Sequence, residues 1–264
     1  MQPNDPNRTS YQGGPNAWNQ PAQGTVNPAA AARPVSVPRE GFLTGAFVWM
    51  FVGLLLSAAS AVFVMNNQSA LTFVLRNPFI VMMGTFALVF AISIFINKLN
   101  PLVSLALFFA YALLNGLWLG VVVLSVTATG VNSQGMPVGG EMSGVVAAFL
   151  GAAAIFAAAA LYGAVTKRDL TSLGGILFMG LIGLLVMMLV QVFFFAQNNT
   201  FNWIIGVVGV VLFTGLTAWD VQRIKSGQMR GLNKDSSSVL GALMLYLDFI
   251  NLFLMLLRIF GSSR

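Results

Sequence analysis

The sequence predicts an all-α integral membrane protein with seven transmembrane helices. Its 264 residues are 57% hydrophobic and only 8% charged, whereas a soluble globular protein carries about 25% charged residues. The apolar residues fall into seven runs, each close to the ~20 residues that a helix needs to cross a bilayer. Most charged residues lie in the short polar segments between these runs.

The first 40 residues differ in composition from the rest of the chain. Gln, Asn, Pro, Gly and Ala dominate residues 1–40, and no hydrophobic period is visible. Such a segment buries too little apolar surface to offset its chain entropy, so we expect a disordered cytoplasmic tail. Tyr11 and Trp18 would suit a docking motif, although a tail without a docking role is the simpler interpretation. Residues 41–264 then form the membrane domain.

Polar and turn-forming residues divide residues 41–264 into seven runs. The second and third runs are separated only by "NKLN", which predicts a tight hairpin, and "TKRDLTS" and "RIKSGQMRGLNKDSSS" are longer interruptions. The predicted transmembrane helices are 42–65, 78–97, 101–126, 143–166, 173–196, 202–222 and 238–260.

Lys and Arg predict the orientation in the membrane, because they concentrate in cytoplasmic segments. With a cytoplasmic N-terminus, three basic residues fall outside, namely Arg76, Arg258 and Arg264. Ten fall inside, namely Arg8, Arg33, Arg39, Lys98, Lys167, Arg168, Arg223, Lys225, Arg230 and Lys234. We therefore expect a multi-pass protein of the plasma membrane with its N-terminus in the cytoplasm and its C-terminus outside.

Small residues recur at helix-contact spacing in the later spans. The fourth span contains "GAAAIFAAAALYGAV", the fifth contains "GGILFMGLIGLL", and the sixth contains Gly206, Gly209 and Gly215. Small residues allow helix backbones to approach closely where lipid gives no hydrophobic drive for association. The pattern predicts a compact bundle.

The composition excludes several functional classes. The chain has no Cys and no His, which removes thiolate nucleophiles, Ser-His catalysis and His-bearing zinc sites. The net charge of +6 does not indicate nucleic acid, because the basic residues do not form a patch with interleaved aromatics. A retinal protein would need a lysine in the seventh span, which has none. We expect no enzymatic activity and no cofactor.

Two aspartates in or next to the last two spans are the candidate functional residues. Asp248 lies in the middle of the seventh run, and Asp220 closes the sixth. A carboxylate at the bilayer centre costs ~2.5–3.5 kcal/mol, so such residues usually face the bundle interior or a water-filled cavity. Helical spacing places Asp248 on one stripe with Gly241, Met244, Asn251 and Met255. The simpler alternative is that each aspartate only caps or hydrogen-bonds a neighbouring helix.

Asp220 shares a stripe of the sixth span with Thr217, Gly206 and Gly209. Two carboxylates about 4 Å apart repel by ~4 kcal/mol at an effective dielectric constant of about 20. A shared proton would therefore hold the two helices together, and its loss would push them apart. The freed oxygens suit a hard cation such as Ca²⁺, with Thr217 and Asn251 as auxiliary oxygen ligands.

Three segments resemble the Bax-inhibitor motif membrane proteins. The last run, "ALMLYLDFINLFLMLLRIFG", is similar to the family's C-terminal signature, "TAWDVQRIK" to its penultimate-helix motif, and "FFAYALLNGLWLG" to its third helix. The resemblance covers residues 41–261. It implies seven helices, with the last one central and enclosed by the other six. It also implies a calcium-permeable, pH-sensitive leak controlled by an aspartate pair, which corresponds to Asp220 and Asp248 here.

The chain departs from the family pattern at two positions. Relatives commonly carry an arginine latch at the inner end of the second helix, where this chain has Asn97 and Lys98. Lys98 is the candidate latch here, although it lacks the bidentate fork of arginine. The third helix often carries an acidic or small residue where this chain has Asn115. We therefore expect the closed state to be held differently.

Three functions remain open at this point. The first is a pH-sensitive calcium leak channel, whose partners are the lipid bilayer, Ca²⁺ and protons. The second is a non-conducting membrane regulator of a protease or of a stress or cell-death response, which requires a membrane-protein partner. The third is a proton-coupled transporter, which would use the same aspartate pair. None of them involves nucleic acid.

Overall fold

The helices of the described chain follow the predicted spans closely. The computed structural model describes residues 41–96, 98–131, 137–138, 142–195, 198–227 and 234–261, all within the compact unit Pro38–Arg264. The predicted tail, residues 1–40, lies outside the described residues, as does Asn97. The helices are α1 (Phe42–Asn66), α2 (Gln68–Arg76), α3 (Pro78–Phe95), α4 (Pro101–Thr127), α5 (Ser143–Val165), α6 (Leu173–Phe194), α7 (Asn199–Lys225) and α8 (Lys234–Gly261).

Seven of these helices are long and apolar enough to cross a membrane, which confirms the all-α membrane fold. The exception is α2, a nine-residue helix that the sequence analysis did not predict. The side chain of Asn67 caps it by accepting a hydrogen bond from Ala70 N at 2.9 Å. A short antiparallel pair, β1 (Gly130–Val131) and β2 (Pro137–Val138), follows α4 and was also not predicted.

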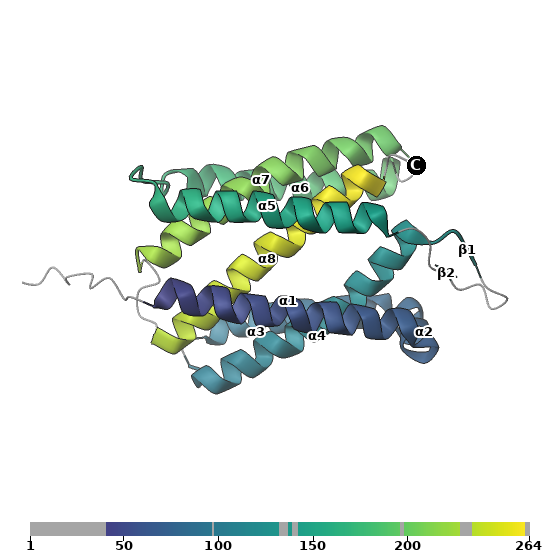
Figure 1. Cartoon of the computed structure of the whole chain (residues 1–264), viewed down its shortest axis with the longest axis horizontal. Helices are drawn as coiled ribbons and strands as arrows, with labels where there is room; N and C mark the ends of the chain where they lie inside the picture. Colours follow the sequence, from purple (N-terminus) through teal and green to yellow (C-terminus); the bar gives the residue numbers. More distant parts are fainter. Residues whose placement is uncertain are drawn as a thin grey trace, which may run out of the picture. The chain divides into compact units, whose positions relative to one another are not determined.

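Helix α8 is the most buried of the seven spans. In an apolar stretch of 18 residues in α8, 72% of the residues are buried, whereas the corresponding share in α6 is 6%. Figure 1 shows α8 running obliquely between α5, α6 and α7 on one side and α1, α3 and α4 on the other. It packs against α1, α4, α5 and α7, while α3 packs on α4 and α6 packs on α7. Enclosure by all six other spans therefore stays a prediction.

Polar side chains join α8 to its neighbours near its C-terminal end. Arg258 Nη1 donates to Gln191 Oε1 of α6 at 2.8 Å and to Asn202 Oδ1 of α7 at 2.9 Å. Gln191 Nε2 in turn donates to Asn202 Oδ1 at 3.1 Å. Arg258 is thus hydrogen-bonded within the bundle, and α6, α7 and α8 are tied together at this level.

Candidate functional site

The candidate site lies where α7 and α8 cross at close range. The predicted glycines make this approach possible: a Cβ on Gly206 would lie 2.8 Å from Ile259 Cγ1 and 3.0 Å from Met255 O. A Cβ on Gly209 would overlap the side chain of Met255. Gly215 serves a different contact, since a Cβ there would lie 2.9 Å from Leu177 of α6. The α7–α8 interface is therefore closed by small residues on α7 and Met255 on α8.

The structure brings the two predicted aspartates together in this interface. Asp220 is 8% exposed and Asp248 is 5% exposed, and their carboxyl groups are in hydrogen-bonding contact. Thr217, one turn before Asp220, is fully buried, and its hydroxyl contacts the Asp248 carboxyl. The same hydroxyl lies 2.7 Å from Phe213 O. Because a hydroxyl has one proton, Thr217 donates either to its own helix or to Asp248.

One carboxylate oxygen in this pair lacks a donor. Among the described residues, Asp248 Oδ2 is the buried side-chain oxygen with no hydrogen-bond partner. Two ionised carboxylates cannot hydrogen-bond each other, because neither carries a proton. Leaving a buried charged acceptor unsatisfied costs more than the ~1–3 kcal/mol of a neutral group. A single proton between Asp220 and Asp248 would supply the missing donor.

A nearby cation that the sequence analysis missed is Arg223. It lies one turn after Asp220 on α7 and interacts electrostatically with that carboxyl. Its guanidinium also lies 5.1 Å from the ring centroid of Trp219, a cation–π contact. The sequence analysis counted Arg223 only as part of the basic loop. Its spacing of three residues from Asp220, which puts both on one helix face, was the signal available.

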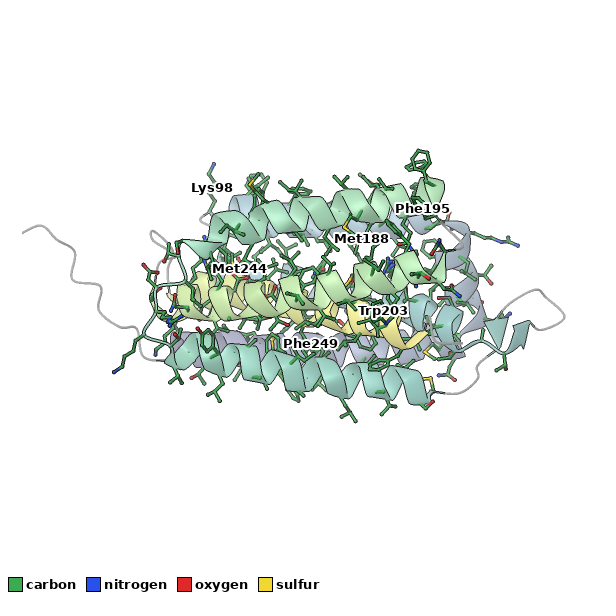
Figure 2. The ribbon with its side chains drawn as sticks, turned by 90° about the horizontal axis from the view of Figure 1, so that it is seen from above. Lys98, Met188, Phe195, Trp203, Met244 and Phe249 are labelled. Atoms are coloured by element: carbon green, nitrogen blue, oxygen red, sulfur yellow. The ribbon has the colours of Figure 1, made fainter. Side chains whose placement is uncertain are left out.

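Two other predicted site residues do not join the pair in this conformation. Lys98 is exposed, and Figure 2 shows it at the edge of the bundle, pointing outward. In the described part of the chain no ion pair connects Lys98 to Asp220, so the latch stays a prediction. Asn251 lies one turn beyond Asp248 and is partly buried. Within the described residues its side chain makes no hydrogen bond to either aspartate.

The end of α7 next to Asp220 is held by the loop between α5 and α6. Gln222 Oε1 accepts from Leu170 N at 2.7 Å, and Gln222 Nε2 donates to Arg168 O at 2.7 Å. In the same loop, Thr171 N donates to Asp169 Oδ1 at 2.9 Å, and the bonds from Thr171 hold the pKa of Asp169 below its usual value. The two bonds of Gln222 join the Asp220 end of α7 to the α5–α6 loop.

The pair offers few side chains that could bind a metal ion. Among the described residues no group of three or more His, Cys, Asp or Glu side chains could hold a metal ion. Asp220, Asp248 and Thr217 offer hard oxygens, which suit Ca²⁺. Since Ca²⁺ takes 6–8 oxygen ligands, water would have to complete the shell.

Comparison with known proteins places the chain among a group of membrane proteins. A family model described as "Inhibitor of apoptosis-promoting Bax1" matches residues 39–264. Inner membrane protein YbhL of Escherichia coli K12 is 38% identical over 238 residues, covering 86% of this chain and 95% of YbhL. An uncharacterized protein of Borreliella burgdorferi is 38% identical over 233 residues, covering 86% and 94%. One of Deinococcus radiodurans is 34% identical over 226 residues, covering 84% and 90%.

Proposed function

Because this multi-pass membrane protein belongs to the family of inhibitors of apoptosis-promoting Bax1, we propose that it is a pH-sensitive leak channel for Ca²⁺. The proposal places it in the plasma membrane, in keeping with the name of its relative, inner membrane protein YbhL, and gives it a cytoplasmic N-terminus. It assigns the gate to Asp220 and Asp248, and it assigns no catalytic residue and no cofactor.

The observation that carries this proposal is the buried contact between two carboxyl groups, one of which leaves an oxygen without a donor. At low pH one shared proton bridges Asp220 and Asp248, and α7 and α8 stay together. As the pH rises the proton leaves. Two charges about 4 Å apart then repel by ~4 kcal/mol at an effective dielectric constant of about 20. That repulsion is enough to shift a two-state helix contact by about a thousandfold.

The opened pair offers oxygens to a cation. Both carboxylates and the Thr217 hydroxyl are free to coordinate Ca²⁺, and Asn251, one turn further along α8, supplies another oxygen if the helices separate. Two carboxylates compensate the charge of one Ca²⁺. Water fills the remaining positions, so binding is weak enough for the ion to leave, as conduction requires.

The test is Ca²⁺ flux into calcium-free liposomes that contain the purified protein, measured from acidic to mildly alkaline pH. We expect the wild-type flux to rise with pH. Asp220→Asn and Asp248→Asn should each abolish the pH dependence, because neither retains two titrating carboxyls in contact. Asp169→Asn is the matched control: it changes an aspartate in an exposed loop and should keep the wild-type profile.

Two results would contradict the proposal. If both buried-site variants keep the wild-type flux and pH midpoint, the pair is structural. If wild-type protein passes no Ca²⁺ above the rate of empty liposomes, a non-conducting regulator that acts through a membrane-protein partner is favoured. A proton-coupled transporter, which would use the same pair, differs from a channel in one measurable respect. Its Ca²⁺ flux would be accompanied by a fixed ratio of proton counterflow.

A further inference from the structure

A second buried polar cluster lies on α8, on the side away from the carboxyl pair. The hydroxyl of Tyr246, which is fully buried, lies 2.6 Å from Ser57 Oγ of α1. It accepts a hydrogen bond from Asn115 Nδ2 of α4 at 2.9 Å. Ser57 Oγ also lies 2.8 Å from Ala112 O of α4. We call these three side chains, Ser57, Asn115 and Tyr246, the tyrosine cluster.

The two hydroxyl protons of the tyrosine cluster can both be satisfied. Asn115 donates to Tyr246, Tyr246 donates its only proton to Ser57, and Ser57 donates to the carbonyl of Ala112 or of Gly53. Both hydroxyl protons then have an acceptor. Fully satisfied buried networks rigidify the elements that they join. Here the joined elements are α1, α4 and α8.

Aromatic packing adds to the attachment of Tyr246. Its ring makes edge contacts with Phe108 at 5.7 Å and with Tyr111 at 5.6 Å, both from α4. The α1–α4 pair beneath it is tightly closed, since Ser60 Oγ donates to Leu113 O at 2.8 Å. A Cβ on Gly116 would overlap the backbone of Ser57. Tyr246 is therefore fixed to a helix pair that has little room to move.

Tyr246 and Asp248 face different neighbours. They are two residues apart on the helix, so at about 100° per residue their side chains point about 160° apart, to nearly opposite sides of the helix axis. Tyr246 meets α1 and α4, and Asp248 meets α7. The two contacts lie on opposite sides of the same helix.

We propose that Tyr246 is a positioning residue that anchors α8 to α1 and α4, so that opening of the carboxyl pair moves α7 and leaves α8 in place. The inference rests on the gate proposed above and specifies which of its two helices moves. With α8 held, the repulsion between Asp220 and Asp248 acts entirely on the α7–α8 contact. Without the anchor, α8 would yield as well, and part of the repulsion would be relieved without separating the helices.

Few other charges act on this movement. The helices α1, α4 and α5 contain no Asp, Glu, Lys or Arg, and their only titratable side chains are Tyr111 and Tyr162. On α7 the charged residues are Asp220, Arg223 and Lys225, and Lys225 Nζ donates to Ala164 O. On the described side chains of α8 they are Asp248 and Arg258, and Arg258 is bonded to Gln191 and Asn202. The Asp220–Asp248 pair, with Arg223 beside it, is thus the charged group between α7 and α8 at this level.

The test measures helix spacing by double electron–electron resonance between spin labels on introduced cysteines, which is clean because the chain has no Cys. Exposed positions are available on α1 (Val62), α7 (Val211) and α8 (Phe260), which are 59%, 70% and 38% exposed. In the wild-type background, raising the pH should lengthen the Val211–Phe260 distance and leave the Val62–Phe260 distance unchanged.

Tyr246→Phe removes the hydroxyl and keeps the ring. At a single pH it should broaden the Val62–Phe260 distribution, and across pH that distance should now change. The ratio of Ca²⁺ flux at high pH to that at low pH should fall about fivefold, the factor that corresponds to one buried hydrogen bond. Tyr111→Phe, which removes a hydroxyl from the same aromatic group, is the control and should behave as wild type. Ser57→Ala should act in the same direction if Tyr246→Phe does not fold.

The two proposals fail in distinguishable ways. A Val211–Phe260 distance that does not respond to pH in the wild-type background contradicts the gate. A Val62–Phe260 distribution that is as narrow in Tyr246→Phe and Ser57→Ala as in the wild-type background contradicts the anchor, whatever the pH response of α7.

Discussion

Thr217 is the residue whose single hydroxyl proton has two possible acceptors, one in its own helix and one in the carboxyl pair. Its hydroxyl lies within reach of both Phe213 O and the Asp248 carboxyl. A hydrogen bond to an ionised acceptor contributes about 1.5–3 kcal/mol, more than one to a neutral carbonyl. Donation to Asp248 therefore stabilises the ionised form of the pair in particular.

Replacing Thr217 by Val should move the pH midpoint of the Ca²⁺ leak upward by about one to two units, because each 1.36 kcal/mol corresponds to one unit. Flux in proteoliposomes across pH measures this shift. Thr214→Val is a matched control on the same helix, since Thr214 donates to Val210 O at 2.6 Å and should leave the midpoint unchanged. Equal midpoints for Thr217→Val and wild type would mean that Thr217 serves only its own helix.

At the scale of single residues, the sequence predicted a site residue where placing that residue type in lipid costs free energy. Asp248 and Asp220 stand out against apolar neighbours, so their common face could be deduced from helical spacing. The tyrosine cluster could not be deduced from the sequence. Ser57 and Tyr246 are 189 positions apart, and each is an ordinary residue in a membrane helix. Arg223 was assigned to topology alone, because a basic residue at a helix end already has that explanation.

At the scale of elements, glycines at the helix contacts determine how closely the backbones of paired helices approach each other. The α1–α4 pair is the clearest case, because a Cβ on Gly116 would meet the backbone of Ser57, which cannot turn aside as a side chain would. Gly183 of α6 is the opposite case, since a Cβ there would meet nothing within 4 Å.

Gly116→Ala should therefore destabilise the protein by about 1–3 kcal/mol through overpacking. Gly183→Ala should be neutral or stabilise it by about 0.5–1 kcal/mol, because it only removes the chain entropy of a helical glycine. Thermal unfolding of both variants in the same detergent measures the difference. A midpoint for Gly116→Ala at or above that for Gly183→Ala would contradict the packing argument.

The element boundaries were predictable wherever a long apolar run ends at a polar or turn-forming residue. Helix α2 was not, because nine residues are too few to span a bilayer and its neighbours "NNQS" and "RNP" suggested a loop. The seventh span, predicted at 238–260, agrees with the apolar span Ser238–Phe260 of α8. The helix itself begins earlier, at Lys234, because polar residues can extend a helix beyond the membrane.

At the scale of the whole molecule, the distribution of Lys and Arg predicts the orientation in the membrane. The fold alone does not predict it. Ten basic residues on one side against three on the other favour a cytoplasmic N-terminus. The seven spans then place the α4–α5 connection outside and the α7–α8 connection inside.

Introduced cysteines test this orientation in intact cells with a membrane-impermeant thiol reagent. Thr129→Cys, in an exposed position after α4, should be labelled, and Ser226→Cys, in an exposed position after α7, should be protected until the cells are opened. No background from native cysteines is expected. Labelling of Ser226→Cys but not of Thr129→Cys in intact cells would reverse the orientation.

The burial of α8 among α1, α4, α5 and α7 has a consequence for biosynthesis. Translation delivers the other six spans to the membrane first, so α8 arrives when its neighbours already surround the place it will occupy. Asp248 then enters a protein interior in which the buried polar groups of Thr217 and Asp220 are already present. We expect that a carboxylate costing ~2.5–3.5 kcal/mol in an isolated helix would cost less where these groups are already in place. We therefore expect the order of synthesis to help the membrane tolerate a span that carries a carboxyl group.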